Sequence, residues 1–189
     1  MLQNTGRGLI ALLLILLEWT HPSLPTPLRP ICDLRVLNGF IKEARDAEVA
    51  MKSCREECSL TASVTVPQTK VDFEVWETKK ADERSQEVQT GLWLLQRALT
   101  LLRTSITNTE LHSHVDNSIT NLQSINAVLN SLNIQDYTPP DSITDLDGTW
   151  SVTSAAELLE VHVNFLRGKL RLLMQGAQAC QPDAHSPAG

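Results

Sequence analysis

Several features that mark whole classes of protein are scarce in this sequence. Its 189 residues include one Tyr and three Phe, and its 8 glycines and 9 prolines are too few for a collagen-like or low-complexity chain. The 16 basic residues are outnumbered by 22 acidic ones, and no Lys or Arg occurs between Arg103 and Arg167. Binding to nucleic acid or to an anionic membrane surface needs clustered positive charge, so neither is expected. With 42% hydrophobic residues, however, the chain has enough to bury and should fold.

Motifs that carry catalysis are also missing. The sequence has no G-x-S-x-G, no P-loop, no G-x-G-x-x-G and no H-E-x-x-H. His112 and His114 are two positions apart, and on a helix they would point about 200° away from each other, so a shared metal is not expected. We therefore predict that the chain is not an enzyme and has no cofactor or metal.

The first residues resemble a targeting segment more than a part of the fold. Arg7 precedes an apolar run from Leu9 to Leu17 that is too short to span a bilayer, and polar residues follow it at Glu18 and Thr20. This pattern predicts a secretory signal peptide over about residues 1–25 and one mature domain over residues 26–189. The mature protein is expected to be secreted and not to insert into membranes.

The four cysteines of a secreted chain are expected to form disulfides, because an oxidising compartment favours disulfides over metal or redox sites. Four cysteines allow three pairings. Cys54 and Cys58 are four residues apart, whereas Cys32 and Cys180 lie near the two ends of the mature chain. We predict the pairs Cys32–Cys180 and Cys54–Cys58. A zinc site at Cys54 and Cys58 is disfavoured, since the nearest histidine is His112.

Four segments place apolar residues at alternating spacings of three and four, which predicts helices at about residues 33–53, 80–104, 111–132 and 154–176. The second segment keeps this pattern through Val88, Leu92, Leu95, Leu99 and Leu102. Alternation typical of a strand is found only from Val64 to Val66, which is too short to found a sheet but could add a small strand. The predicted fold class is therefore all-α.

The lengths of the three connections predict how the helices are arranged. They are about 26, 6 and 21 residues long, and only a long connection lets consecutive helices run parallel. Long, short, long predicts an up-up-down-down, long-chain four-helix bundle with two overhand crossover loops. In such a bundle the first helix starts where the fourth ends, so Cys32 and Cys180 can come within disulfide distance.

The fourth helix has a wider apolar arc than a core stripe needs. Leu158, Val161, Phe165 and Leu172 extend the arc to about 200°, and polar residues flank it. This flanking stripe consists of Glu157, Glu160, Asn164, Arg167, Gly168 and Arg171. A protein-binding surface would have this composition. The segment after Cys58 could instead cover the extra apolar residues, and periodicity alone favours neither interpretation.

Several stretches resemble a known family. They are ICDLRVL at 31–37, the Cys54 and Cys58 pair, TVPQTKVDF at 65–73 with Trp76, HVD at 114–116 and, most specifically, NFLRGKL at 164–170. The chain is similar over nearly the whole mature sequence to the erythropoietin/thrombopoietin group of long-chain four-helix cytokines. The tight Cys54 and Cys58 spacing favours the erythropoietin-like branch over a thrombopoietin-like cytokine.

The resemblance implies a monomeric hormone that binds and dimerises a homodimeric cell-surface cytokine receptor. Kinases attached to the receptor would then promote survival, proliferation and differentiation of erythroid precursors. A secreted helical bundle that carries an apolar ligand in its core is the alternative from a different class.

Carried over by position, the resemblance implies two receptor-binding faces. The high-affinity face would comprise Arg45, Thr69, Lys70, Phe73, Asn164, Arg167, Gly168 and Leu172. The low-affinity face would comprise Val36, Gly39, Phe40, Thr120, Gln123, Ser124 and Val128.

Three positions in or beside these faces depart from the family pattern, and so do the glycosylation sites. Gly39 and Gln123 stand where mammalian members have arginines, and Glu160 stands where a basic residue is usual. Mammalian members carry N-linked glycans, but this chain has no Asn-x-Ser/Thr sequon, so no N-glycosylation is expected. The low-affinity face should therefore be less electrostatic than is usual in the family.

Overall fold

The computed structural model describes residues 29–54, 58–134, 137–139 and 147–181. The predicted signal peptide at residues 1–25 lies outside the described residues, as do residues 140–146 of the connection between the third and fourth predicted helices. Most of the described chain is helical, in agreement with the predicted class. None of the helices in these ranges has both the length and the apolar character needed to cross a bilayer.

The long helices lie where the apolar periodicity predicts them. They are α2 (Leu34–Ser53), α4 (Ala81–Ser105), α5 (His112–Ser131) and α6 (Ala155–Phe165), the last of which continues through the π-helical segment η3 (Leu166–Leu170) into α7 (Arg171–Gln175). Shorter helical segments are α3 (Phe73–Thr78), η2 (Thr109–Leu111) and η4 (Gln178–Cys180). The fourth predicted helix is therefore correct in extent, but it is interrupted by a π turn that periodicity did not reveal.

Side-chain caps explain where two of these helices begin. The Asp33 carboxylate accepts a hydrogen bond from the backbone N–H of Arg35 (2.9 Å), and the Ser154 hydroxyl accepts one from the N–H of Glu157 (3.2 Å). Each bond satisfies a backbone donor that has no partner inside the helix. Both helices consequently begin at the residue after the cap.

Beside the helices, the described chain forms a small two-stranded sheet. Strand β1 (Ser59–Pro67) pairs antiparallel with β2 (Thr149–Ser154), with Val64 opposite Val152 and Val66 opposite Trp150. In β2 only Val152 is buried, so its sequence shows almost none of the alternation from which strands are predicted. The Val64–Val66 alternation did mark the strand, but pairing with β2 extends it well beyond those residues.

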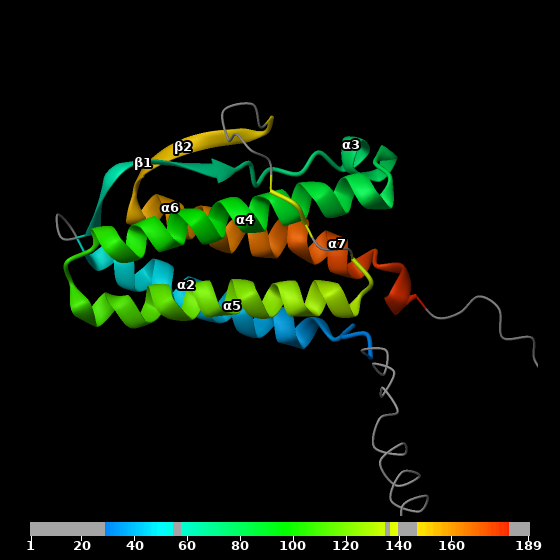
Figure 1. Ribbon diagram of the computed structural model, residues 1–189, viewed down its shortest axis with the longest axis horizontal. Helices are drawn as coiled ribbons and strands as arrows, with labels where there is room; N and C mark the ends of the chain where they lie inside the picture. The colour runs from blue at the N-terminus through cyan, green and yellow to red at the C-terminus, as the bar shows by residue number, and fades with distance from the viewer. Residues whose placement is uncertain (1–28, 55–57, 135–136, 140–146, 182–189) are drawn as a thin grey trace, which may run out of the picture.

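The four long helical segments pack around a common core. α2 contacts α5 and α6, and α4 contacts α5 and α6, while the sheet lies against α4 and α6 (Figure 1). The predicted stripe on α4 is buried in full. At Gly91, in the middle of α4, a Cβ atom would lie 2.3 Å from Cζ of Phe165, so a side chain here would clash with the buried ring. Gly91 thus permits close approach of α4 and α6.

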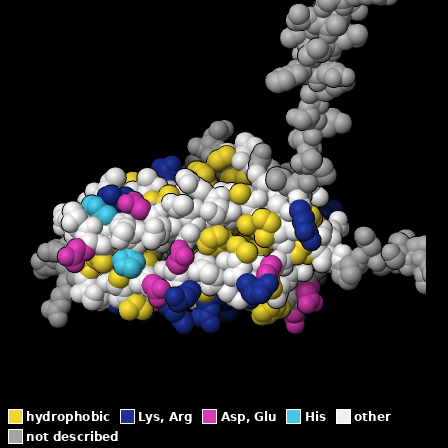
Figure 2. All heavy atoms as spheres, turned by 90° about the horizontal axis from the view of Figure 1, so that it is seen from below, with side chains coloured by type: hydrophobic (Ala, Val, Ile, Leu, Met, Phe, Trp, Pro, Cys, Tyr) yellow, Lys and Arg dark blue, Asp and Glu magenta, His cyan; other side chains and the backbone are white. Residues whose placement is uncertain are grey.

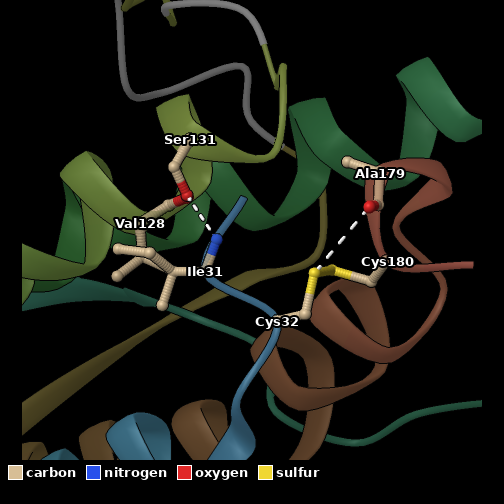
Figure 3. Close-up of a disulfide and its surroundings, with 6 residues drawn as sticks. All are labelled: Ile31, Cys32, Val128, Ser131, Ala179 and Cys180. Atoms are coloured by element: carbon tan, nitrogen blue, oxygen red, sulfur yellow. Dashed lines mark hydrogen bonds between the residues drawn. A yellow bond between two sulfur atoms is a disulfide. The ribbon is translucent and has the colours of Figure 1, made fainter. Parts of the chain in front are cut away.

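The starts of α2 and α4 lie at the same end of the molecule as the ends of α5 and α7 (Figure 1). The Cys32–Cys180 disulfide joins the residues beside α2 and α7, with Cα atoms 5.5 Å apart (Figure 3). The N–H of Ile31 donates to Ser131 Oγ at the end of α5 (3.1 Å). A Cβ at Gly176 would lie 3.9 Å from Nη1 of Arg84 on α4. The second predicted disulfide, Cys54–Cys58, is present as well.

Candidate functional site

The high-affinity-face residues come from three parts of the chain. Arg45 lies on α2, Thr69, Lys70 and Phe73 lie between β1 and the start of α3, and the others follow one another from α6 to α7. Arg45, Lys70, Phe73, Asn164 and Arg167 are exposed, whereas Thr69, Gly168 and Leu172 are half-buried. Phe73 has 61% of its surface exposed, which is unusual for a phenylalanine and leaves its ring available to a partner.

The segment after β1 meets the fourth helix at Gly168. A Cβ at Gly168 would lie 3.6 Å from the carbonyl oxygen of Thr69 and 3.7 Å from Cγ2 of Val71. Lys70 and Lys169 line the same pocket of about 210 Å³. Residues about a hundred positions apart in the sequence are therefore brought together, among them Thr69 and Gly168, which were predicted to share the high-affinity face.

The extra apolar arc of the fourth helix is covered, which decides between the two interpretations left open above. Leu158, Val161 and Phe165 are each at most 4% exposed, and α6 packs against β1 and β2. Only Leu172 keeps part of its side chain at the surface. The sheet therefore covers part of the arc, and α4 contacts Phe165 at Gly91. The exposed residues Asn164 of α6 and Arg167 of η3 belong to the polar stripe.

Glu160, which stands where a basic residue is usual in the family, lies near a basic residue of α2. Lys52 of α2 binds the Glu48 carboxylate at 2.6 Å, which raises the pKa of Lys52, and the nearby charge of Glu160 raises it further. Glu160 thus faces a basic residue of the neighbouring helix. An acidic side chain at this position suits its surroundings in this chain.

The low-affinity-face residues lie on α2 and α5, which pack against each other. Val36, Gly39, Thr120 and Gln123 are exposed, and Phe40 and Ser124 are half-buried. Val128 is only 6% exposed and belongs to the hydrophobic core, so it offers little surface to a partner. A Cβ at Gly39 would meet no atom within 4 Å, so the surface is open there.

This face is apolar at its centre. Val36 and the half-buried Phe40 are its apolar side chains at the surface, and they lie over buried residues that are each at most 6% exposed: Leu37, Ile125, Val128 and Met174. Figure 2 shows hydrophobic side chains gathered on this side of the molecule, with Lys and Arg side chains mostly toward the lower edge of the view. The residues predicted for this face are therefore apolar or uncharged, and their role in binding stays a prediction.

A partly buried ion-pair cluster beside the residues predicted for the high-affinity face could not be predicted from the sequence. Glu87 of α4 accepts hydrogen bonds from Lys169 (2.6 Å) and from Lys79. Burial raises the pKa of Glu87, but the bonds from Lys169 and Lys79 outweigh that effect, so the pKa lies below its ordinary value. The carboxylate is therefore charged at neutral pH. Partners so far apart in the sequence give no local signal.

Comparison with known proteins finds a family and several relatives that are similar over most of the chain. The family model described as Erythropoietin/thrombopoietin matches residues 29–183. Erythropoietin from Epinephelus coioides is 74% identical over 183 residues, which cover 97% of this chain and 99% of that protein. Erythropoietin from Danio rerio is 54% identical (93% and 96% covered), and that from Equus caballus is 37% identical (92% and 93% covered).

These relatives do not favour the thrombopoietin-like alternative, since each of them is an erythropoietin. Both the family match and the relatives extend over the described helices, the sheet and both disulfides. The chain therefore belongs to the erythropoietin/thrombopoietin family, whose members are cytokine hormones and not enzymes.

Proposed function

We propose that this chain is a secreted, erythropoietin-like hormone that binds two copies of one cell-surface cytokine receptor through different faces. Receptor-associated tyrosine kinases would then drive survival, proliferation and differentiation of erythroid precursors. The observation that carries the proposal is the meeting of the segment at Thr69 with Gly168, because it assembles the high-affinity face from distant parts of the chain. The relatives named erythropoietin supply the hormone class.

The proposed hormone has an up-up-down-down four-helix topology with two crossover connections. Support comes from the end of the molecule where α2 and α4 start and α5 and α7 finish. Residues 1–25 are proposed to be a signal peptide that is removed, which leaves residues 26–189 as a single domain. The two disulfides are typical of an exported protein.

On the high-affinity face, Arg167 and Lys70 are proposed to make charge-assisted hydrogen bonds to acidic receptor groups. Phe73 is the proposed aromatic anchor, and Gly168 allows close approach. On the low-affinity face, Val36 and the open surface at Gly39 would contact the second receptor copy mainly through apolar groups.

Arg167→Glu is expected to weaken receptor binding at least about a hundredfold, because an exposed interface arginine would become a like charge facing an acidic receptor surface. The measurement is the Kd of the purified mature chain for an erythropoietin-receptor ectodomain, together with the response of receptor-bearing cells. Arg97→Glu, an exposed arginine of α4 outside both faces, is the matched control. Unchanged potency of the Arg167 variant would contradict the proposal and favour the carrier alternative.

Stoichiometry tests the two-face arrangement independently. Light scattering of the mature chain with excess receptor ectodomain should give two receptors per hormone. A complex with one receptor would remove the low-affinity face from the proposal, and the absence of any complex would overturn it.

Gln123→Arg is expected to strengthen binding of the second receptor copy roughly threefold to tenfold, since a new charge would be added to a face that lacks one. The measurement is the affinity for the second ectodomain at low and high salt, and the gain should shrink at high salt. Asn126→Arg adds the same charge to the exposed surface of α5 on the side toward α4, and it should give no gain. Equal effects of both variants would argue against a specific contact at Gln123.

A further inference from the structure

The ion-pair cluster at Glu87 joins three segments that the two binding faces do not explain. Oε1 of Glu87 accepts from Nζ of Lys169 in η3 (2.6 Å), and Oε2 accepts from Nζ of Lys79, directly after α3. One carboxylate of α4 therefore pairs with a residue at the end of α3 and with one in the π-helical segment. These are the segments that carry Phe73 and Gly168.

Lys169 is the most strongly constrained residue of this cluster. The side chain of Lys169 is 9% exposed, and among the described residues its ammonium is paired with Glu87. A buried ammonium without a counter-charge is strongly unfavourable, so the position of Lys169 depends on that of Glu87. The Lys79 side chain is 33% exposed and is the weaker member of the cluster.

The location of Lys169 connects this constraint to the high-affinity face. Lys169 is the fourth residue of η3, next to Gly168 and two residues after Arg167. A π turn has one more residue than an α turn, so its backbone directs side chains differently from the adjacent helix. The ion pair holds the η3 backbone in place at Lys169. It should therefore also set the direction in which the Arg167 side chain points from the surface.

We propose that Glu87 is a positioning residue for receptor binding: through Lys169 and Lys79 it holds η3 and α3 in the arrangement that presents Arg167 and Phe73 together. This inference rests on the proposed function of the high-affinity face. Glu87 itself is not expected to touch the receptor. Its contribution is pre-organisation: because these segments are already ordered in the free hormone, binding does not lose the conformational entropy of ordering them.

The test is Glu87→Gln in the full mature chain, with the Kd for monomeric receptor ectodomain as the readout. Binding is expected to weaken about tenfold, mainly through a faster dissociation rate. Asp116→Asn is the matched control, since it removes a carboxylate that bridges α4 and α5 by binding Arg103 at 2.7 Å, away from η3. The control should leave the Kd unchanged.

Coupling to Arg167 separates positioning from general stability. If Glu87 acts through Arg167, Arg167→Ala should cost several-fold less affinity in the Glu87→Gln background than in the unmodified chain. Full additivity of the two changes would overturn the proposal, and so would a lowered Tm with an unchanged Kd. In either case the unmodified chain still binds, so the proposed function would stand.

A milder variant keeps the test decisive if Glu87→Gln does not fold. Lys79→Met removes only the partly exposed ion pair and leaves Lys169 paired with Glu87. It is expected to weaken binding about threefold, and an unchanged Kd would overturn the role assigned to α3. If the unmodified chain fails to bind the receptor ectodomain, the proposed function is overturned, and this inference falls with it.

Discussion

Replacing Cys32 and Cys180 together by serine is expected to lower the free energy of unfolding by about 5 kcal/mol. The two cysteines are 148 residues apart, so their disulfide removes a large part of the conformational entropy of the unfolded chain. A loss of that size is comparable to the whole stability of many small domains. Urea unfolding of the purified mature chain under non-reducing conditions measures it.

The second disulfide provides the control for this prediction. Cys54 and Cys58 are separated by only 4 residues, and the same entropy argument predicts a loss of about 2 kcal/mol when both are replaced by serine. Equal losses in the two double variants would mean that local packing, and not ring size, determines the contribution of each disulfide.

The surroundings of Cys32 add local contacts that the serine variant would keep. Ser131 Oγ accepts from the N–H of Ile31 and donates to the carbonyl of Val128 (2.6 Å), which ties the entry to α2 to the end of α5 (Figure 3). Sγ of Cys32 lies 3.8 Å from the carbonyl of Ala179, a contact without a hydrogen bond because a disulfide sulfur carries no proton. The expected loss is therefore dominated by the unfolded state.

The helices could be predicted from sequence because their signals are local and repeated. The stripe from Val88 to Leu102 recurs over several turns, and Asp33 and Ser154 mark helix starts by capping chemistry that acts within three residues. The predicted disulfides were also correct, since helix order alone brings Cys32 near Cys180. Each of these predictions needed only spacing along the chain.

Features that depend on tertiary contacts gave no comparable signal. Strand β2 exists because β1 pairs with it, and its only buried residue is Val152. Val128 was placed on a face by position, but packing between α2 and α5 buries it. The pairing of Glu87 with Lys169 likewise follows from the packing of η3 near α4 and not from the residues around either partner. Sequence therefore predicted the helices better than the surfaces they form.

His162 gives the last prediction, because it is buried without a hydrogen-bond partner. It lies on α6 with 0% of its surface exposed, and neither ring nitrogen has a partner among the described residues. Burial disfavours the charged imidazolium and lowers the pKa of His162 to about 4. The folded protein should therefore keep this ring neutral at neutral pH.

The sign of the resulting pH dependence follows from proton binding. In the unfolded chain a histidine takes up a proton below about pH 6.5, whereas in the folded protein His162 does so only near pH 4. Between these values the unfolded state binds more protons, so stability is fully present above about pH 6.5 and is lost as the pH falls. With about 1.4 kcal/mol for each unit of pKa difference, the loss attributable to His162 is about 3 kcal/mol by pH 4.

His162→Leu should remove this part of the acid sensitivity, because leucine has a similar volume and cannot take up a proton. Urea unfolding at pH 7, 6, 5 and 4 should show the unmodified chain losing about 3 kcal/mol more than the variant. Titrating carboxylates destabilise both proteins alike, so the difference between them isolates His162. His114→Leu, a half-buried position on α5, should retain the acid loss of the unmodified chain. Parallel stability curves for His162→Leu and the unmodified chain would show that His162 is accommodated in its charged form.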